Sequence, residues 1–543
     1  MKCLFAMMSL LLVSGCGGMG GADMSAPSAM GATPDGSQDA GFFRGLLESG
    51  AVPQAGDINL EGFMSEHDIP FTDEGCNQVL CLSALVGHDR AVAESVDSEN
   101  GEASATFIQL AMATNVNLDE RARTPLNLAV VVDVSGSMAS GGKLDYVKEG
   151  LLLMVSELGA EDRLALVTYS SYAQVVVASQ PVGDGQVFLD AIGALYPQGS
   201  TNLYDGMVLG YQQVSDNLDG VALARVMLLS DGLANVGIVD SASIIERSSA
   251  YNNEGIGITT IGVGLDINQD LMRELSEQGG GNFYFIESPE KVIVVFKDEL
   301  DFLVTPLANN LTATIELGEN FTLVDVYGFS YNWDEGGNMV VTVPTVFASR
   351  RGGAMLIRVE SRDALSALQG EVVTRITYSY EPLSNEGTVL PEETYISTAT
   401  VPSANEANIF ASDGVHKSIV VWNMVQSFQA ASNAHHVDHA NLRAIEHIEE
   451  LAAYVDAANA ILEDDEISRD RSELINQFAL NLGGYTGDPR WDAENDDVHY
   501  GDDMVHEGSF FPFGCAATSG NGLGGVFCLV VLAGLLRLRR RRR

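Results

Sequence analysis

Continuous apolar runs alternate with amphipathic stretches along the middle of the chain, between residues 126 and 303. Runs such as "LNLAVVVD" and "ARVMLLS" are apolar at nearly every position, which is typical of strands buried on both faces. Six such runs alternate with six stretches of helical spacing. This order predicts a doubly wound α/β domain with a mainly parallel, six-stranded sheet covered by helices on both faces. The expected helices are 143–158, 185–195, 203–218, 241–253, 268–278 and 289–300.

The pattern changes on both sides of this domain. Residues 304–402 alternate apolar and polar positions between Gly, Asn and Asp turns, which predicts an antiparallel, sandwich-like β domain. Residues 403–485 have helical spacing and predict a helical region. Residues 40–125 contain two short helical patterns and a strand pattern, so we expect a small N-terminal accessory module. Segments 17–39 and 486–514 lack periodicity and are expected to be a flexible linker and an acidic linker.

The first 16 residues resemble a bacterial lipoprotein signal peptide. One Lys precedes the apolar run "LFAMMSLLLV", and the small residues "SG" stand directly before Cys16. The resemblance implies export, cleavage and lipidation of Cys16. Gly17, not Asp, follows the Cys, so nothing indicates retention at the inner membrane, and we expect a lipid-anchored protein at the outer membrane or cell surface. A short buried helix is the alternative for this segment.

Residues 515–543 form the other distinctive end. They combine Cys515, a Gly-rich stretch, an apolar run over 526–536 and a block of Arg. The apolar run is shorter than the roughly 20 residues that span a bilayer comfortably. The whole segment resembles the sorting tails of myxobacteria and related bacteria, which implies its removal after export. A permanent short anchor is the alternative.

The chain is strongly acidic. Its 543 residues include 74 Asp and Glu against 29 Lys and Arg, which gives a formal net charge of −45. A protein with this charge repels nucleic acid and anionic lipid surfaces. We therefore exclude a nucleic-acid partner and expect contact with the membrane only through the lipid anchor. The length indicates several domains.

Two of the six Cys lie outside the end segments. Cys76 and Cys81 are separated by "NQVL", and no second Cys or His pair with zinc spacing lies near them. In an oxidising compartment this spacing favours a small, loop-closing disulfide over a metal site.

Oxygen-bearing side chains gather in three loops of the predicted α/β domain. Asp133, Ser135 and Ser137 directly follow the first strand in "VVVDVSGSM", Thr201 precedes a helix in "QGSTNLYDG", and Asp231 follows the fourth strand in "MLLSDG". In an extended turn, residues two apart face the same side, so the first three can point at one ion. Hydroxyl and carboxylate oxygens suit Mg²⁺, with Mn²⁺ and Ca²⁺ as alternatives. Asp and Ser are also common caps and turn formers, which is the competing explanation.

The five residues, in this order, resemble the metal-ion-dependent adhesion site of the von Willebrand factor A family, "D-x-S-x-S … T … D". The resemblance implies a Rossmann-like sheet with strand order 3-2-1-4-5-6, in which the first and fourth strands lie side by side. It also implies that Ser135, Ser137 and Thr201 bind the ion through their hydroxyls, while Asp133 and Asp231 act largely through water. Because the hydroxyl ligands are neutral, the positive charge of such an ion is only partly balanced, and the ion takes a further ligand from a partner. The regions around this domain are similar to those of bacterial lipoproteins with a central domain of this family.

These observations predict a metal-dependent binding protein of the bacterial envelope. Its partner would be a protein that supplies an Asp or Glu carboxylate to the ion. The alternative is an envelope assembly or structural factor whose α/β domain docks in a fixed complex. We expect no enzyme, because the sequence contains no recognisable set of acid, base and nucleophile and no "GxSxG" elbow.

Overall fold

A computed structural model describes most of the chain between residues 36 and 483. The expected signal peptide with Cys16, the acidic linker 486–514 and the tail with Cys515 lie outside the described residues. The described ranges are 36–38, 40–69, 76–89, 106–117, 124–220, 222–279, 281–286, 295–296, 306–329, 331–347, 355–362, 367–384, 387–402 and 409–483.

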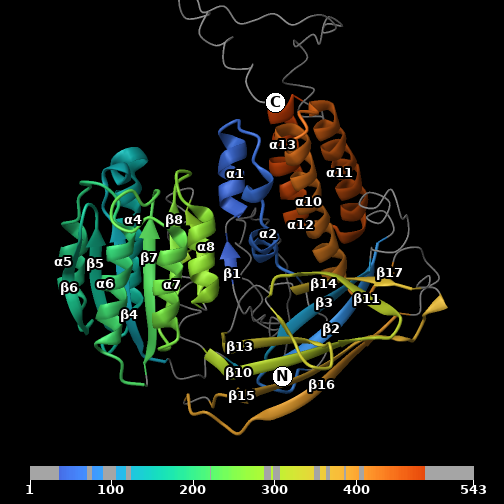
Figure 1. Cartoon of the computed structure of the whole chain (residues 1–543), viewed down its shortest axis with the longest axis horizontal. Helices are drawn as coiled ribbons and strands as arrows, with labels where there is room; N and C mark the ends of the chain where they lie inside the picture. The colour runs from blue at the N-terminus through green and yellow to red at the C-terminus, as the bar shows by residue number, and fades with distance from the viewer. Residues whose placement is uncertain are drawn as a thin grey trace, which may run out of the picture. The chain divides into compact units, whose positions relative to one another are not determined.

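Seven strands form the sheet of the α/β domain, in the order β1-β9-β8-β7-β4-β5-β6 (Figure 1). All neighbouring strands are parallel except β5 and β6. The six predicted strands are therefore confirmed, and the first and fourth of them, β4 and β7, lie side by side as the resemblance implied. Their bounds are β4 Leu126–Asp133, β5 Arg163–Tyr169, β6 Ala173–Pro181, β7 Leu223–Ser230, β8 Gly257–Val263 and β9 Asn282–Ile286.

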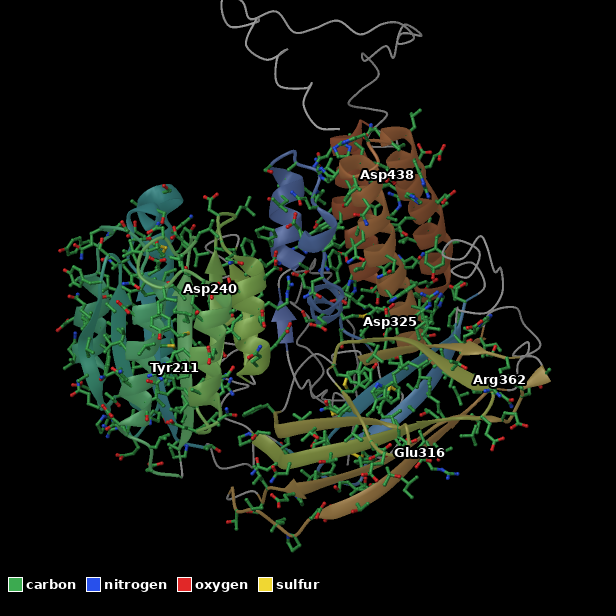
Figure 2. All side chains as sticks on the ribbon, viewed as in Figure 1. Tyr211, Asp240, Glu316, Asp325, Arg362 and Asp438 are labelled. Carbon is green, nitrogen blue, oxygen red and sulfur yellow. A yellow bond between two sulfur atoms is a disulfide. The ribbon has the colours of Figure 1, made fainter. Side chains whose placement is uncertain are left out.

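Successive residues of each strand point to opposite faces of the sheet, so apolar side chains lie on both faces and helices cover both. Val130 of β4 belongs to a buried cluster with residues of α4 and α5, whereas Val131 belongs to a cluster with residues of α6, α7 and α8. In the second cluster Tyr211 of α6, labelled in Figure 2, stacks on Tyr251 of α7, with ring centroids 4.6 Å apart. The sixth expected helix, 289–300, lies mostly outside the described residues. The bounds are α4 Lys143–Glu157, α5 Gln186–Gly193, α6 Leu203–Ser215, α7 Ser241–Asn252 and α8 Gln269–Gln278.

The seventh strand corrects one prediction. Residues Gly36–Gln38 form β1, which pairs in parallel with β9, although we expected a flexible linker up to residue 39. A short segment can pair with the edge strand of a sheet through its backbone N–H and C=O groups alone. The segment "GSQ" therefore needs no apolar pattern, and its sequence carries no strand signal.

Two five-stranded sheets form the β domain, and the α/β domain is inserted between their strands along the chain. One sheet has the order β12-β13-β10-β15-β16, and the other has β11-β14-β3-β2-β17. The segment expected as an accessory module thus forms no sheet of its own, because its strands β2 and β3 pair with each other and β3 also pairs with β14. The bounds are β2 Cys81–His88, β3 Thr106–Ala113, β10 Pro306–Leu317, β11 Phe321–Tyr327, β12 Asn332–Trp333, β13 Met339–Phe347, β14 Met355–Ser361, β15 Val372–Pro382, β16 Glu393–Thr400 and β17 Ile409–Phe410.

Helices from both ends of the described chain share one core. Phe43 of α1 lies 4.9 Å from Phe428 of α10 and 5.3 Å from Phe63 of α2, measured between ring centroids. Phe478 of α13 stacks on Phe428 at 5.3 Å. The predicted C-terminal helical region is confirmed, and the N-terminal helices pack into it. The bounds are α1 Ala40–Glu48, α2 Leu60–Glu66, α10 Asp413–His436, α11 Asn441–Leu462, α12 Asp465–Asp470 and α13 Asn476–Leu482, with a π-helical turn at Arg471–Ile475.

A disulfide joins Cys76 to Cys81 at the start of β2, in agreement with the pairing that the sequence favoured. Among the described residues, no helix is both long and apolar enough to cross a membrane.

Candidate metal site

Asp133 ends β4 and is completely buried. Its Oδ1 accepts a hydrogen bond from the backbone N of Ser135 at 2.8 Å, and its Oδ2 accepts one from Ser230 Oγ of β7 at 3.3 Å. Burial raises the pKa of the Asp133 carboxyl to about 6, although the hydrogen bonds from Ser135 oppose the shift. The Asp133 side chain is thus held between β4 and β7, where burial makes its negative charge unfavourable unless a cation lies beside it.

Three further predicted residues meet beside it. Ser137 Oγ donates to Asp231 Oδ1 at 2.7 Å, and Ser135 Oγ lies 2.9 Å from Ser137 Oγ and 3.4 Å from the same Asp231 oxygen. Asp231 directly follows β7 and is fully buried. Parallel neighbours β4 and β7 end at the same edge of the sheet, which brings together residues almost 100 positions apart. The structure therefore gathers four of the five predicted residues in direct contact.

The fifth residue, Thr201, is buried in the loop before α6. Its backbone N donates to Asn235 Oδ1 at 2.9 Å, and its carbonyl accepts from Asn235 N at 3.0 Å. In the same loop the carbonyl of Gly199 accepts from Gly136 N at 3.1 Å. These bonds tie the Thr201 loop both to the segment that follows β4 and to the one that follows β7.

Gly199 shows why this loop can approach so closely. Its φ is +75°, and a Cβ at this position would lie 2.7 Å from Ser171 Oγ. Any other residue would be strained and would push the loop away from β5. The turn that carries Thr201 thus depends on a glycine two residues before it.

Sequence reasoning missed three residues of the site. Ser230 bonds Asp133, Asn235 bonds the Thr201 backbone, and Lys143 Nζ lies 3.1 Å from Asp231 Oδ2. Lys143 begins α4, ten positions after Asp133. A single positively charged residue so close to the acidic motif was the sequence signal that could have indicated its place in the site. Ser230 and Asn235 stand beside or near Asp231 in the sequence, but hydroxyl and amide residues are too common in loops to be noticed there.

The donor set fits a hard divalent cation. Two buried carboxylates and the hydroxyls of Ser135, Ser137 and Thr201 provide only oxygen ligands, which Mg²⁺ and Mn²⁺ prefer. None of these five side chains offers a nitrogen or sulfur atom, the commonest ligand atoms of structural zinc sites. When bound, such an ion would supply positive charge and coordination positions for an anionic ligand.

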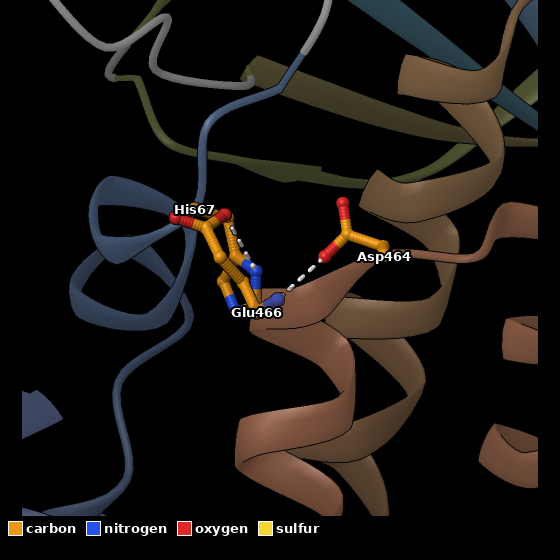
Figure 3. A group of neighbouring side chains, drawn as sticks. All are labelled: His67, Asp464 and Glu466. Atoms are coloured by element: carbon orange, nitrogen blue, oxygen red, sulfur yellow. Dashed lines mark hydrogen bonds and ion pairs between the residues drawn. The ribbon is translucent and has the colours of Figure 1, made fainter. Parts of the chain in front are cut away.

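A second group of possible ligands lies where α2 meets α12 (Figure 3). Ligand atoms of His67, Asp464 and Glu466 lie within 4.8 Å of one another. However, the ammonium of Lys417 on α10 already bonds Asp464 Oδ2 at 2.6 Å and Glu466 Oε2 at 2.8 Å, and His67 Nε2 bonds Asp470 Oδ2 at 2.9 Å. The Lys417 ammonium thus already pairs with both carboxylates, and the group is a partly buried ion-pair network between the N-terminal and C-terminal helices.

Residues 127–298 match the model of the family described as "von Willebrand factor type A domain". The matched range contains all five predicted site residues.

Curated proteins match the same part of the chain. "Uncharacterized protein YfbK" of Escherichia coli (strain K12) is 31% identical over 191 residues, which are 35% of this chain and 33% of that protein. "Inter-alpha-trypsin inhibitor heavy chain H2" of Sus scrofa is 25% identical over 198 residues, which are 34% of this chain and 21% of that protein. The chain therefore spans about a third or less of the length of these two relatives.

Solved structures are similar at lower identity. "von Willebrand factor type A from Catenulispora acidiphila" covers 72% of this chain and 89% of its own at 14% identity, with a TM-score of 0.48. A structure of "proximal thread matrix protein 1 (PTMP1) from the mussel byssus with zinc occupied MIDAS motif" covers 33% of this chain and 49% of its own at 15% identity, with a TM-score of 0.29.

Proposed function

We propose that the chain binds a partner protein through a divalent cation held at the carboxyl edge of β4 and β7, within the residues that match the von Willebrand factor type A domain model. Asp133, Ser135, Ser137, Thr201 and Asp231 would hold the ion, with Mg²⁺ as the first candidate. The partner would supply an Asp or Glu carboxylate as a further ligand. The proposal includes no catalytic step.

One observation carries the proposal: Ser135, Ser137 and Asp231 share hydrogen bonds of 2.7–3.4 Å beside the buried Asp133 carboxylate. The two carboxylates carry a charge of about −2, and the adjacent Lys143 ammonium contributes +1. A divalent ion balances the charge of the two carboxylates, and the coordination positions that the protein does not fill can take an anionic ligand. Mg²⁺ also tends to keep positions that a carboxylate can take over from water.

Exposed apolar side chains lie in loops at the same edge of the sheet and support a protein partner. Tyr172 is 60% exposed, Leu233 58%, Val239 52%, Ile238 41% and Leu265 37%. They lie in the three loops that follow β5, β7 and β8 at the same edge of the sheet as Asp133. Apolar side chains around a polar centre are typical of protein interfaces, in which buried anchors and a specific polar contact act together.

The isosteric change Thr201→Val tests the role of the cation. We expect Mn²⁺ to bind the variant at least about tenfold more weakly, because a ligand hydroxyl is lost while the loop keeps its backbone bonds to Asn235. Calorimetric titration of the full chain measures this. The immobilised chain should also capture a protein from envelope extracts with Mg²⁺ but not with EDTA, and the variant should not.

Two results would separate the alternatives. Blocking the carboxyl groups of the extract with a carbodiimide and an amine should abolish capture, because the partner's carboxylate is the proposed ligand. Capture that survives both EDTA and Thr201→Val would contradict the proposal and favour metal-independent docking, as expected of an envelope assembly factor.

We also propose that the mature chain is lipid-anchored through Cys16 at the outer membrane or cell surface. The support is the sequence of the first 16 residues, with an apolar run and a small pair before the Cys. We expect Cys16→Ser to lose incorporation of an alkyne fatty acid in cells and to shift from the membrane fraction to the soluble one. Cys3→Ser is the matched control and should behave like the wild type. Labelling of the Cys16→Ser chain at the wild-type level would refute the anchor.

A further inference from the structure

Lys143 shares the Asp231 carboxylate with the two serines of the site. Its Nζ lies 3.1 Å from Asp231 Oδ2, while Ser137 and Ser135 bond the other oxygen, Oδ1. The Lys143 side chain is 12% exposed and that of Asp231 is fully buried. The ammonium is therefore a built-in counterion at one of the two acidic residues of the site.

The backbone and a neighbouring loop direct this side chain inward. Gly142 caps α4 with a φ of +72°, so the helix starts at Lys143, close to the end of the motif segment. The aliphatic stem runs along Gly264 in the loop after β8, where an added Cβ would lie 2.7 Å from Lys143 Cε. Lysine commonly buries its stem in this way while its charge reaches a polar group. Here the charge reaches Asp231.

We propose that the Lys143 ammonium competes with the divalent cation for Asp231 and thereby sets the metal concentration at which the site fills. This inference rests on the proposed function, because it requires the ion to bind at these residues. An ion held by Ser135 and Ser137 would lie on the Oδ1 side of Asp231, while the ammonium draws on the same carboxylate charge through Oδ2, and the two cations repel each other. Filling the site is therefore favoured when the ammonium moves away along its flexible stem.

The competition has a second consequence for the protein without divalent ions. Asp231 and Asp133 are both fully buried, and a buried carboxylate without a countercharge destabilises the fold. Lys143 offsets one of these two charges. Removing the Lys143 charge should therefore raise the affinity for the metal and lower the stability of the protein in EDTA. A residue that only supports the fold would not produce both effects.

The experiment compares Lys143→Met with Lys148→Met in the full chain. Lys148 lies on the same helix, is partly exposed and bonds the Gly193 carbonyl at 3.3 Å, so its replacement removes the same charge away from the site. By calorimetric titration we expect the Mn²⁺ Kd of Lys143→Met to fall about tenfold, as for the loss of a competing unit charge near the ion. Its Tm should fall in EDTA and rise more on addition of Mn²⁺ than that of the wild type. Lys148→Met should match the wild type in both measurements.

Each outcome decides a different point. A wild-type chain that fails to bind Mn²⁺ at millimolar concentration would sink the proposed function itself. A wild-type chain that binds, with Lys143→Met binding equally or more weakly, would overturn the inference alone. Should Lys143→Met fail to fold, Lys143→Gln keeps a hydrogen-bond donor without the charge and must show the same gain in Mn²⁺ affinity.

Discussion

Replacing Lys417 with methionine is expected to lower the free energy of unfolding of the helical core by about 3 kcal/mol, within the range found when one partner of a buried pair is removed. The Lys417 side chain is 3% exposed, and its Nζ bonds Asp464 Oδ2, Glu466 Oε2 and the Asp68 carbonyl at 2.6–2.8 Å. Methionine fills a similar volume but leaves two neighbouring carboxylates without their cation. Because these carboxylates are 22% and 25% exposed, water recovers part of the loss.

Urea unfolding followed by tryptophan fluorescence measures this loss of stability in the helical core. The three tryptophans of the chain lie outside the α/β domain, and Trp422, on α10 together with Lys417, is fully buried, whereas Trp333 is 58% exposed. Loss of the blue-shifted emission of a buried tryptophan therefore reports on the helical core. Lys148→Met removes an equal charge at a partly exposed position outside the network and should stay within about 0.5 kcal/mol of the wild type. An unchanged urea midpoint for Lys417→Met would show that the network contributes nothing to stability.

The same network gives the core a defined sensitivity to acid. Burial would raise the pKa of Asp464 and of Glu466, but the hydrogen bond from Lys417, a backbone N–H hydrogen bond to each carboxylate and the charge of Lys417 together outweigh it and lower both from their ordinary values of 3.8 and 4.5. A carboxylate with a lowered folded pKa contributes stability above its unfolded pKa and loses it as the pH falls through the folded value. The core should thus keep this stability at pH 5 and lose it below about pH 4. Lys417→Met should move the loss to higher pH.

The sequence predicted the α/β domain and much of its site because both depend on local patterns. A strand buried on both faces must be apolar at nearly every position, which made "LNLAVVVD" readable. Asp133, Ser137 and Asp231 each stand near the end of such a run, and parallel strands end at one edge of the sheet. The order of the strands was not readable from these patterns and came with the family resemblance.

The rest depends on pairing between distant segments. β2 and β3 have ordinary strand sequences, and nothing local indicates that β14, the second partner of β3, lies beyond the α/β domain. Lys417 stands directly before the apolar run "SIVVW", and its burial depends on acceptors about 50 and about 350 positions away. Lys143 likewise meets Asp231 only because β4 and β7 are neighbours. Such contacts depend on which strands and helices become neighbours in the fold, and no local pattern in the sequence indicates that.

Asp133→Asn should weaken Mn²⁺ binding about 100-fold or more while the fold stays intact. Asparagine keeps the shape of the side chain, and its Oδ1 can still accept from Ser135 N, so the turn after β4 is preserved. What disappears is one of the two buried negative charges that favour a cation. Calorimetric titration measures the affinity, and the loss follows from the role of carboxylates that orient and neutralise a bound ion.

The effect on stability separates loss of binding from loss of fold. Burial raises the pKa of the Asp133 carboxyl to about 6, so at pH 7 its charge costs folding energy that the neutral amide does not. In EDTA the variant should therefore be at least as stable as the wild type, whereas Mn²⁺ should raise the Tm of the wild type only. Asp240→Asn is the matched control, because Asp240 caps α7 at an exposed position and asparagine caps equally well (Figure 2). Wild-type Mn²⁺ affinity in Asp133→Asn would mean that any bound cation lies elsewhere, and the proposed binding mechanism would fail with it.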